Sequence, residues 1–199
     1  MRVGVFGGTF DPIHIGHLVS AEEVRVKLEL ERVVFVPARL PPHKLDHVVS
    51  PVEHRLAMVE LAIASNPHFA VSRVDIDRSG PSYTVDTIEL LRDAWGPDVE
   101  IYFIMGSDSL LDILTWHEPR RLIKLCHFAV VSRPGYQVDL DELDTLLPGV
   151  ASRVQMLNAP ELAISSTDIQ RRVREGLPIK YQVAEAVEDY IYQRKLYQV

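Results

Sequence analysis

Short apolar runs alternate with stretches of helical periodicity along the whole chain. Runs that are rich in β-branched residues and poor in charges are typical of strands buried on both faces. Six such runs predict strands, and the last of them is short: Arg2 to Phe6, Arg32 to Pro37, Phe69 to Ile76, Glu100 to Met105, His127 to Val131, and Val154 to Leu157. Because helical stretches separate these strands, we predict an α/β fold with a doubly wound, mostly parallel sheet and helices on both faces.

Polar and turn-forming residues mark where the intervening helices begin. Ser50 is expected to cap a helix with Pro51 at its first position, and Glu53 completes a capping box. Ser165 is a second candidate N-cap, because an acidic residue follows it three positions later. Further helices are predicted from near Ile15, from Thr84 to Arg92, and from Ala184 to Arg194.

The loop after the first predicted strand concentrates glycine and histidine. It reads Gly7-Gly8-Thr9-Phe10-Asp11-Pro12-Ile13-His14-Ile15-Gly16-His17. The paired glycines let backbone N–H groups approach a ligand closely, and both histidines fall at a helix N-terminus, where anions bind. The stretch predicts a phosphate-binding turn, although it is neither a P-loop nor a Gly-x-Gly-x-x-Gly fingerprint.

Other interpretations of this turn stay open at the level of sequence. The two histidines can simply cap the helix, or they can form part of a zinc site together with His43, His47 and His54. The zinc site is disfavoured, because imidazoles three residues apart with no fixed third ligand make only a partial site. Asp11 can bind magnesium or stiffen the turn through an Asx bond, and we favour the second role.

Composition limits the classes of function. With 199 residues and 47% hydrophobic content, the chain can bury a core of ordinary size, so we expect one domain over residues 1–199. Its formal net charge of −7 argues against a nucleic acid or an anionic membrane as the main partner. The single cysteine, Cys126, has no partner for an intrachain disulfide. Together with the absence of a signal-peptide pattern or a long apolar run, this predicts a cytoplasmic protein.

The other unusual residues also come directly after predicted strands. Following the second to the sixth strand in turn, they are Lys44, then Tyr83 and Thr84, then Gly106 to Trp116, then Arg133, and then Ser165 to Thr167. Ligands of doubly wound sheets lie outside the carboxyl ends of the strands. The sequence therefore predicts one site at that edge of the sheet.

The turn from Gly7 to His17 closely resembles the signature of the adenylyltransferase superfamily, in which a glycine precedes the second of two histidines just after the first strand. Further segments, spread over nearly the whole chain, resemble the bacterial nicotinate-nucleotide adenylyltransferase family: Pro42-His43-Lys44, Ser82-Tyr83-Thr84-Val85-Asp86-Thr87, Gly106-Ser107-Asp108, Trp116, and Ile164-Ser165-Ser166-Thr167. The resemblance implies a Rossmann-like nucleotidyltransferase domain, with the C-terminal helices of about residues 164–199 packed against the sheet. It also implies adenylyl transfer from ATP to nicotinate mononucleotide with Mg²⁺, giving deamido-NAD and pyrophosphate.

The resemblance assigns catalysis to His14 and His17, with His17 nearest the α-phosphorus of ATP. This role suits the chemistry, because the acceptor phosphate is already a nucleophile and the protein has only to position and neutralise the phosphates. The ATP-binding residues that we expect are Gly7, Gly8, Thr9, Phe10, His14, His17, Gly106, Asp108, Ile164, Ser165, Ser166, Thr167 and Arg171. No protein residue is expected to ligate a metal ion.

The acceptor site needs a flat surface, a carboxylate site and a phosphate site. We expect Trp116 to stack on the pyridine ring and backbone N–H groups at Tyr83 and Thr84 to bind the carboxylate. Lys44 and Arg133 are expected to hold the phosphate. Taken singly, each residue has a plain structural explanation, and only their joint placement favours a site. No acidic residue stands immediately beside Tyr83 and Thr84, so the acid is expected to be preferred over the amide.

Two positions depart from the family pattern. Gln170 stands where arginine is usual, with Arg171 and Arg172 next to it, and Ala184 stands where proline commonly opens the last helix. The first departure leaves the choice of the triphosphate arginine open by one residue.

Three other functions compete with this interpretation. Pantetheine-phosphate adenylyltransferase is disfavoured, because pantetheine has neither a ring to stack on Trp116 nor a carboxylate for Tyr83 and Thr84. A nucleotide-binding regulator without turnover is disfavoured because both histidines are present. A metal-dependent hydrolase built on the histidines is the third alternative. The expected partners are ATP and nicotinate mononucleotide, with a homo-oligomer left open.

Overall fold

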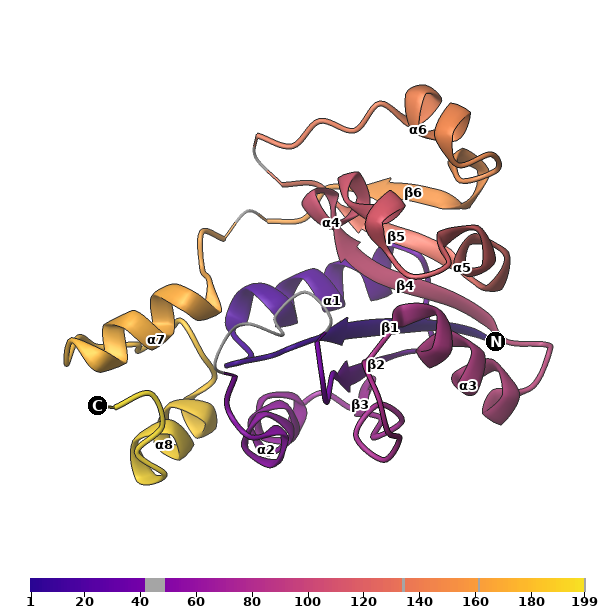
Figure 1. Ribbon diagram of the computed structural model, residues 1–199. Helices are drawn as coiled ribbons and strands as arrows, with labels where there is room; N and C mark the ends of the chain where they lie inside the picture. Colours follow the sequence, from indigo (N-terminus) through magenta and orange to yellow (C-terminus); the bar gives the residue numbers. More distant parts are fainter. Residues whose placement is uncertain (42–48, 134, 161, 199) are drawn as a thin grey trace.

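The computed structural model describes residues 1–41, 49–133, 135–160 and 162–198. Its centre is a six-stranded sheet in the order β3-β2-β1-β4-β5-β6, in which every neighbouring pair is parallel. The strands are β1 (Arg2–Gly8), β2 (Arg32–Pro37), β3 (Phe69–Val71), β4 (Glu100–Gly106), β5 (His127–Val131) and β6 (Val154–Leu157). The predicted α/β fold with a doubly wound parallel sheet is confirmed (Figure 1).

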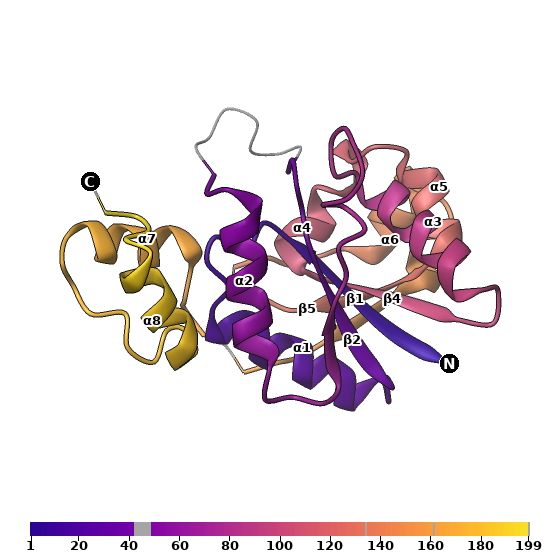
Figure 2. The ribbon, with the colours of Figure 1, turned by 90° about the horizontal axis from the view of Figure 1, so that it is seen from below.

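Helices cover both faces of the sheet (Figures 1 and 2). They are α1 (Ile15–Lys27), α2 (Val52–Ile63), α3 (Thr84–Trp95), α4 (Ser107–Leu111), α5 (Pro119–Leu125), α6 (Leu140–Leu146), α7 (Ser166–Arg174) and α8 (Glu185–Gln193), with short 3₁₀ turns η2 (Ile113–Thr115) and η3 (Ala151–Arg153). No helix in the described part of the chain is long and apolar enough to cross a membrane.

The two faces of the sheet bury two separate apolar clusters. In β2, Val33 and Phe35 belong to the cluster beneath α1 and α2, whereas Val34 and Val36 belong to the cluster beneath α3 and α5. This alternation follows from the two-residue period of a strand. It explains why the strands read as nearly continuous apolar runs, since neighbouring apolar residues of a strand meet opposite clusters.

The strand order reverses between β1 and β4, which both pair with neighbours at the centre of the sheet. In Figure 1 the strand arrows point toward the side on which α7 lies. Ligands of such sheets bind outside the carboxyl ends of the strands at the reversal point. The loops after β1 and β4 are therefore the first place to look for a site.

The helices α7 and α8 lie beyond this end of the sheet, next to α2 (Figures 1 and 2). Ile169 of α7 and Val187 of α8 are fully buried in the same cluster as Met58 of α2. A hydrogen bond of 2.9 Å joins His54 Nδ1 to the Tyr190 hydroxyl. The C-terminal part of the chain thus packs beside the loop that follows β1.

Two local predictions are wrong. The strand predicted over Phe69 to Ile76 ends at Val71, because a turn begins at Arg73, whose carbonyl accepts from the Ile76 amide. The predicted cap at Ser50 is absent, since α2 starts at Val52 with Pro51 at the N-cap position and no side-chain cap. The backbone of Ser50 instead bonds to the side chains of Asp11 and Arg55.

Candidate active site

The turn between β1 and α1 brings the two signature histidines face to face. Their rings are stacked, with centroids 3.6 Å apart and planes 24° from parallel. His14 occupies the N-cap position of α1, and its backbone N–H donates to His17 Nδ1 at 3.2 Å. Because Nδ1 of a neutral His17 accepts this bond, the proton of the ring lies on Nε2. His17 therefore presents an N–H donor from its other ring nitrogen.

The side chain of His14 is buried at the start of α1. It is 7% exposed, and its Nδ1 atom is buried without a partner in the described part of the chain. Burial, followed by the positive charge of Arg133, lowers the pKa of His14 to about 4. The imidazole is consequently neutral at pH 7, so it adds no positive charge at the head of α1.

Phe10 belongs to the core as well as to the turn. Its ring is 3% exposed and packs edge-on against His17, with centroids 5.2 Å apart. A Cβ atom on Gly8 would lie 2.9 Å from the Phe10 ring, so no larger residue fits there without displacing it. The Phe10 side chain thus supports the turn, which leaves its backbone for the predicted nucleotide contact.

Asp11 ties the turn to distant parts of the chain. Its carboxylate is 5% exposed and accepts from the Ser50 amide at 3.0 Å and from the Tyr197 hydroxyl at 2.6 Å. The side-chain amide of Gln170 donates to the Asp11 carbonyl at 2.6 Å. The favoured Asx bond is not what engages Asp11, because both of its carboxylate oxygens bond to groups outside the turn.

Arg55 holds the same turn in place through hydrogen bonds to backbone carbonyls. The side chain is 1% exposed, and it donates to the carbonyls of Ser50, Thr9 and Ala38 at 2.7 to 2.9 Å. Burial lowers the pKa of the guanidinium, and the neighbouring Asp11 carboxylate opposes that shift. Arg55 therefore joins the loops after β1 and β2 through their backbones, a role that its position in the predicted helix did not reveal.

The segments that follow β4 and β5 hold a second group of charged side chains. Arg133 pairs with Asp108 at 2.8 Å, and its backbone N–H donates to the Ser107 hydroxyl at 3.0 Å. A Cβ on Gly106 would lie 2.3 Å from Asp108 Oδ1 and 2.8 Å from Arg133 Nε, which accounts for glycine at that position. Because Arg133 lowers the pKa of His14, it lies in electrostatic reach of the signature turn.

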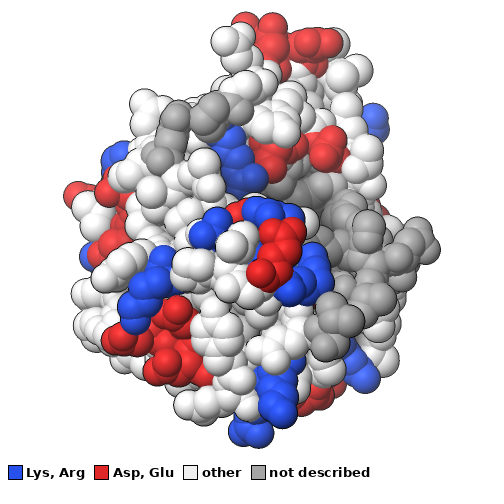
Figure 3. All heavy atoms as spheres, turned by 90° about the vertical axis from the view of Figure 1, so that its left-hand side faces the viewer, with Lys and Arg blue, Asp and Glu red and all other residues white. Residues whose placement is uncertain are grey.

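The start of α7 contacts the signature turn. Ser165 caps α7 by accepting from the Asp168 amide at 3.1 Å, as expected, and Ser166 donates to the Pro12 carbonyl at 2.9 Å. Ile164 is half-buried just before this start, and Thr167 is exposed. This end of the molecule is shown in Figure 3, where basic and acidic side chains lie among one another.

Position 170, and not position 171, reaches the turn. Arg171 pairs with Asp168 and Glu175 along its own helix and is 47% exposed. Gln170 instead makes the contact to Asp11 described above. A role for Arg171 with the triphosphate stays a prediction.

A cavity opens beside the turn, between β1, β2 and α3. Its lining comprises Gly7, Gly8, Thr9, Val36, Ala38, Pro41, Asp75, Ser82, Thr84, Thr87, Phe103 and Trp116. The structure thus brings Trp116 and Thr84, predicted for the acceptor, to the same cavity as the glycines predicted for ATP. Arg133 is not in this lining, and Lys44 falls outside the described residues.

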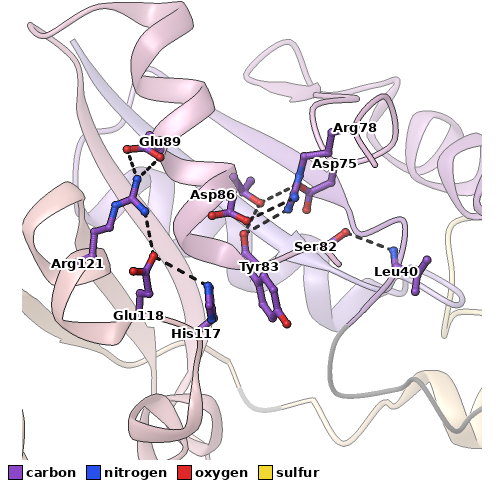
Figure 4. A network of polar contacts seen from close by, with 11 residues as sticks. Leu40, Asp75, Arg78, Ser82, Tyr83, Asp86, Glu89, His117, Glu118 and Arg121 are labelled. Carbon is purple, nitrogen blue, oxygen red and sulfur yellow. Dashed lines mark hydrogen bonds and ion pairs between the residues drawn. The ribbon is translucent and has the colours of Figure 1, made fainter. Parts of the chain in front are cut away.

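Trp116 and Tyr83 are held by aromatic neighbours. The Trp116 ring meets Phe103 edge-on, with centroids 5.9 Å apart and planes at 89°, so its orientation within the cavity is fixed by β4. Tyr83 stacks on His117 with centroids 4.2 Å apart. Tyr83 and His117 also lie side by side in Figure 4. Tyr83 is not in the lining of the cavity, and its backbone stands at the N-cap of α3.

The expected site residues leave out three polar residues of the cavity, Asp75, Ser82 and Thr87, although Ser82 and Thr87 lie in the segment that resembles the family. Asp75 lies in the turn that was predicted as strand, and Thr87 lies one turn into α3. Contrary to the expectation of no acidic neighbour, the Asp75 carboxylate lies in the wall of the same cavity as Thr84, because the chain turns back at Arg73.

Metal ligands are not gathered in the described ranges, where no three histidine, cysteine, aspartate or glutamate side chains form a candidate site. Cys126 is buried, and burial raises the pKa of its thiol to about 12. Nucleophilic catalysis by this thiol is disfavoured, since the thiolate is the reactive form.

Comparison with known proteins agrees with these observations. Residues 5–172 match the cytidylyltransferase-like family model. A relative from Moorella thermoacetica, named "Probable nicotinate-nucleotide adenylyltransferase", is 52% identical over 98% of this chain and 91% of its own length. A relative of the same name from Thermomicrobium roseum is 50% identical over the same shares.

The solved structure of Plasmodium falciparum nicotinic acid mononucleotide adenylyltransferase, complexed with NaAD, superposes with a TM-score of 0.81. It is 22% identical and covers 98% of this chain and 97% of its own, so it supports the fold. The resemblance seen in the sequence is confirmed by the curated relatives. The chain belongs to the cytidylyltransferase-like family and, within it, to the nicotinate-nucleotide adenylyltransferases.

Proposed function

We propose that this protein transfers the adenylyl group of ATP to nicotinate mononucleotide, forming deamido-NAD and pyrophosphate in NAD biosynthesis. The observation that carries the proposal is the joint lining of one cavity by the signature glycines, Thr84 and Trp116. Near full-length relatives that are about half identical support the same activity. A phosphate oxygen of the acceptor forms a bond to the α-phosphorus, while the bond from that phosphorus to the β-bridging oxygen breaks.

The signature histidines would stabilise this transition state by donating to phosphate oxygens. The backbone N–H of His14 donates to His17 Nδ1, which in a neutral ring places the proton on Nε2 and makes that atom a donor. The stacked ring of His14 lies beside it. No general base is needed, because the acceptor phosphate is already ionised.

Magnesium would enter as the ATP complex. The described residues do not form a site for the ion by themselves, and the Asp11 carboxylate is already engaged by Ser50 and Tyr197. The ion when bound would neutralise charge on the leaving pyrophosphate, as Mg²⁺ held chiefly by substrate phosphates does.

The acceptor side of the cavity would distinguish nicotinate mononucleotide from acceptors that lack its ring or its carboxylate. Trp116 offers a face for the pyridine, and the N-terminus of α3 at Tyr83 and Thr84 offers N–H donors for the carboxylate. Pantetheine phosphate would leave both features unused, so we rank that acceptor second. The buried single cysteine suits a reducing cytoplasm, which we propose as the location.

One coupled assay tests this proposal. We expect kcat/KM for nicotinate mononucleotide to exceed that for nicotinamide mononucleotide by on the order of 10²-fold or more, because the amide leaves an NH₂ facing other donors. Pantetheine phosphate should give no turnover above background. Equal values for acid and amide would contradict the carboxylate site, and turnover of pantetheine phosphate alone would replace the proposed acceptor.

A further inference from the structure

An ion pair in the wall of the acceptor cavity has no part in the mechanism above. Asp75 lines the cavity and is 4% exposed. Its Oδ1 atom accepts from the Thr87 hydroxyl at 2.7 Å and from Arg78 Nε at 2.9 Å (Figure 4). A carboxylate thus lies buried in the very cavity that is proposed to receive a second carboxylate, that of nicotinate.

Arg78 joins this carboxylate to the start of α3. Its Nη2 atom donates to the Tyr83 carbonyl at 3.4 Å, and its Nη1 atom lies 3.6 Å from Asp86 Oδ2. Only 18% of the side chain is exposed, and it does not line the cavity. Arg78 therefore acts on the cavity through Asp75 and the α3 terminus and does not meet the acceptor itself.

The charges at the α3 terminus explain why such a cation is needed. The backbone N–H groups at Tyr83 and Thr84 favour an anion, whereas an uncompensated Asp75 would repel one. Asp75 would also accept a hydrogen bond from the NH₂ of a carboxamide, and so would favour the amide. The guanidinium of Arg78 neutralises the charge of Asp75, which removes the repulsion, and its bond to Oδ1 weakens Asp75 as an acceptor for a carboxamide.

We propose that Arg78 is a positioning residue that sets the preference for acid over amide by neutralising Asp75 in the wall of the acceptor cavity. The inference rests on the proposed function, because it concerns how that cavity tells nicotinate from nicotinamide. Thr87 completes the arrangement, since its hydroxyl donates to the same Asp75 oxygen.

The test compares kcat/KM for nicotinate and nicotinamide mononucleotides in the wild type, in Arg78→Gln, in Asp75→Asn and in the double variant. Arg78→Gln should lower the acid-to-amide ratio by about 10-fold or more, mainly through KM for the acid. Asp75→Asn should raise the ratio, because the cavity wall then loses its negative charge while the guanidinium of Arg78 stays, paired among the described residues only with Asp86. The double variant should recover most of the wild-type ratio.

The matched control is Arg73→Gln, which removes an arginine from the same turn. Arg73 pairs with Asp77 in solvent, with exposed fractions of 53% and 61%, so its loss should leave the ratio unchanged. An Arg78→Gln ratio within about twofold of the wild type, or an equal loss for both acceptors, would overturn the inference. If Arg78→Gln does not fold, Asp75→Asn decides, and a fall in its ratio overturns the inference. A wild type without acid preference would instead refute the proposed function.

Discussion

The two halves of the site are held in place by different means. The signature turn is fixed by buried groups: Arg55, 1% exposed, donates to the Thr9 carbonyl, and the carboxylate of Asp11, 5% exposed, accepts from Ser50 and Tyr197. The acceptor side combines the largely buried pair of Asp75 and Arg78 with exposed pairs at its edge, such as Arg121 with its partners Glu89 and Glu118 (Figure 4). The half proposed to handle the triphosphate is thus held by buried groups, while the half proposed to choose the acceptor is held partly by exposed ones.

This difference has an energetic consequence. Removing a buried partner leaves polar groups unsatisfied and costs about 1–3 kcal/mol for each, whereas an exposed ion pair contributes about 0–1 kcal/mol. Substitutions on the turn side should therefore disturb stability and catalysis together. Substitutions of exposed side chains on the acceptor side should leave the free energy of unfolding nearly constant.

The largest expected effect is on catalysis by His17. His17→Ala should lower kcat by roughly 10²-fold or more, as loss of a comparable oxyanion donor does, with little change in KM for ATP. The matched control is His68→Ala, because His68 is exposed and its ring bonds only to the Glu31 carbonyl among the contacts described. A kcat near the wild-type value in the His17 variant would remove His17 from the mechanism.

The pH dependence of stability should report His14. The unfolded chain binds a proton there with a pKa of about 6.5, whereas burial lowers the folded value to about 4. The free energy of unfolding should therefore fall as the pH drops from about 6.5 to about 4, by about 3 kcal/mol from this residue. Urea titrations across this range should show a flatter dependence for His14→Gln. A constant difference between the two proteins at every pH would contradict this assignment.

Trp116 tests the acceptor side. Trp116→Ala should raise KM for nicotinate mononucleotide, with a loss of about 1–3 kcal/mol by analogy with base stacking, and leave KM for ATP nearly unchanged. Trp95→Ala is the control, since Trp95 packs at the far end of α3 beside Arg32 and should affect only the melting temperature. Equal harm to both substrates in the Trp116 variant would indicate a purely structural tryptophan.

The smallest expected effect concerns the contact between Tyr197 and Asp11. Tyr197→Phe removes one hydrogen bond to a buried carboxylate, so the free energy of unfolding should fall by about 1.5 kcal/mol. KM for ATP should rise a few-fold while the ratio of acid to amide stays fixed. Tyr181→Phe, at a side chain that is 84% exposed, should change neither quantity. A changed acceptor ratio in Tyr197→Phe would show that the two halves of the site are not independent.

The sheet and the place of the site could be predicted because both depend on local pattern. Apolar runs such as Arg32 to Pro37 predicted the strands. Residues that directly follow the strands of a parallel sheet share one edge of that sheet. The prediction of the third strand was too long, because it rested on the same kind of local pattern. Val74 and Ile76 continue an alternation typical of a strand, although the chain turns at Arg73.

What could not be predicted depends on contacts between distant residues. Ser50 has the composition of a helix cap, yet Asp11 and Arg55 engage its backbone from other loops. Nothing local to Asp75 indicated that it would lie beside Thr84 in a cavity. Side chains whose partners lie far away in sequence carry no periodic signal, so only the folded chain reveals their roles.

The hydrogen bond between Asp11 and Tyr197 also determines when the turn can be completed during synthesis of the protein. The two residues are 186 positions apart, so the turn leaves the ribosome long before its partner is made. Domains begin to fold while the chain is still growing. A nascent chain can assemble most of the sheet and still lack the Tyr197 hydroxyl that bonds to Asp11 in the turn after β1. Nucleotide binding at full strength should therefore be among the last properties that the newly made protein acquires.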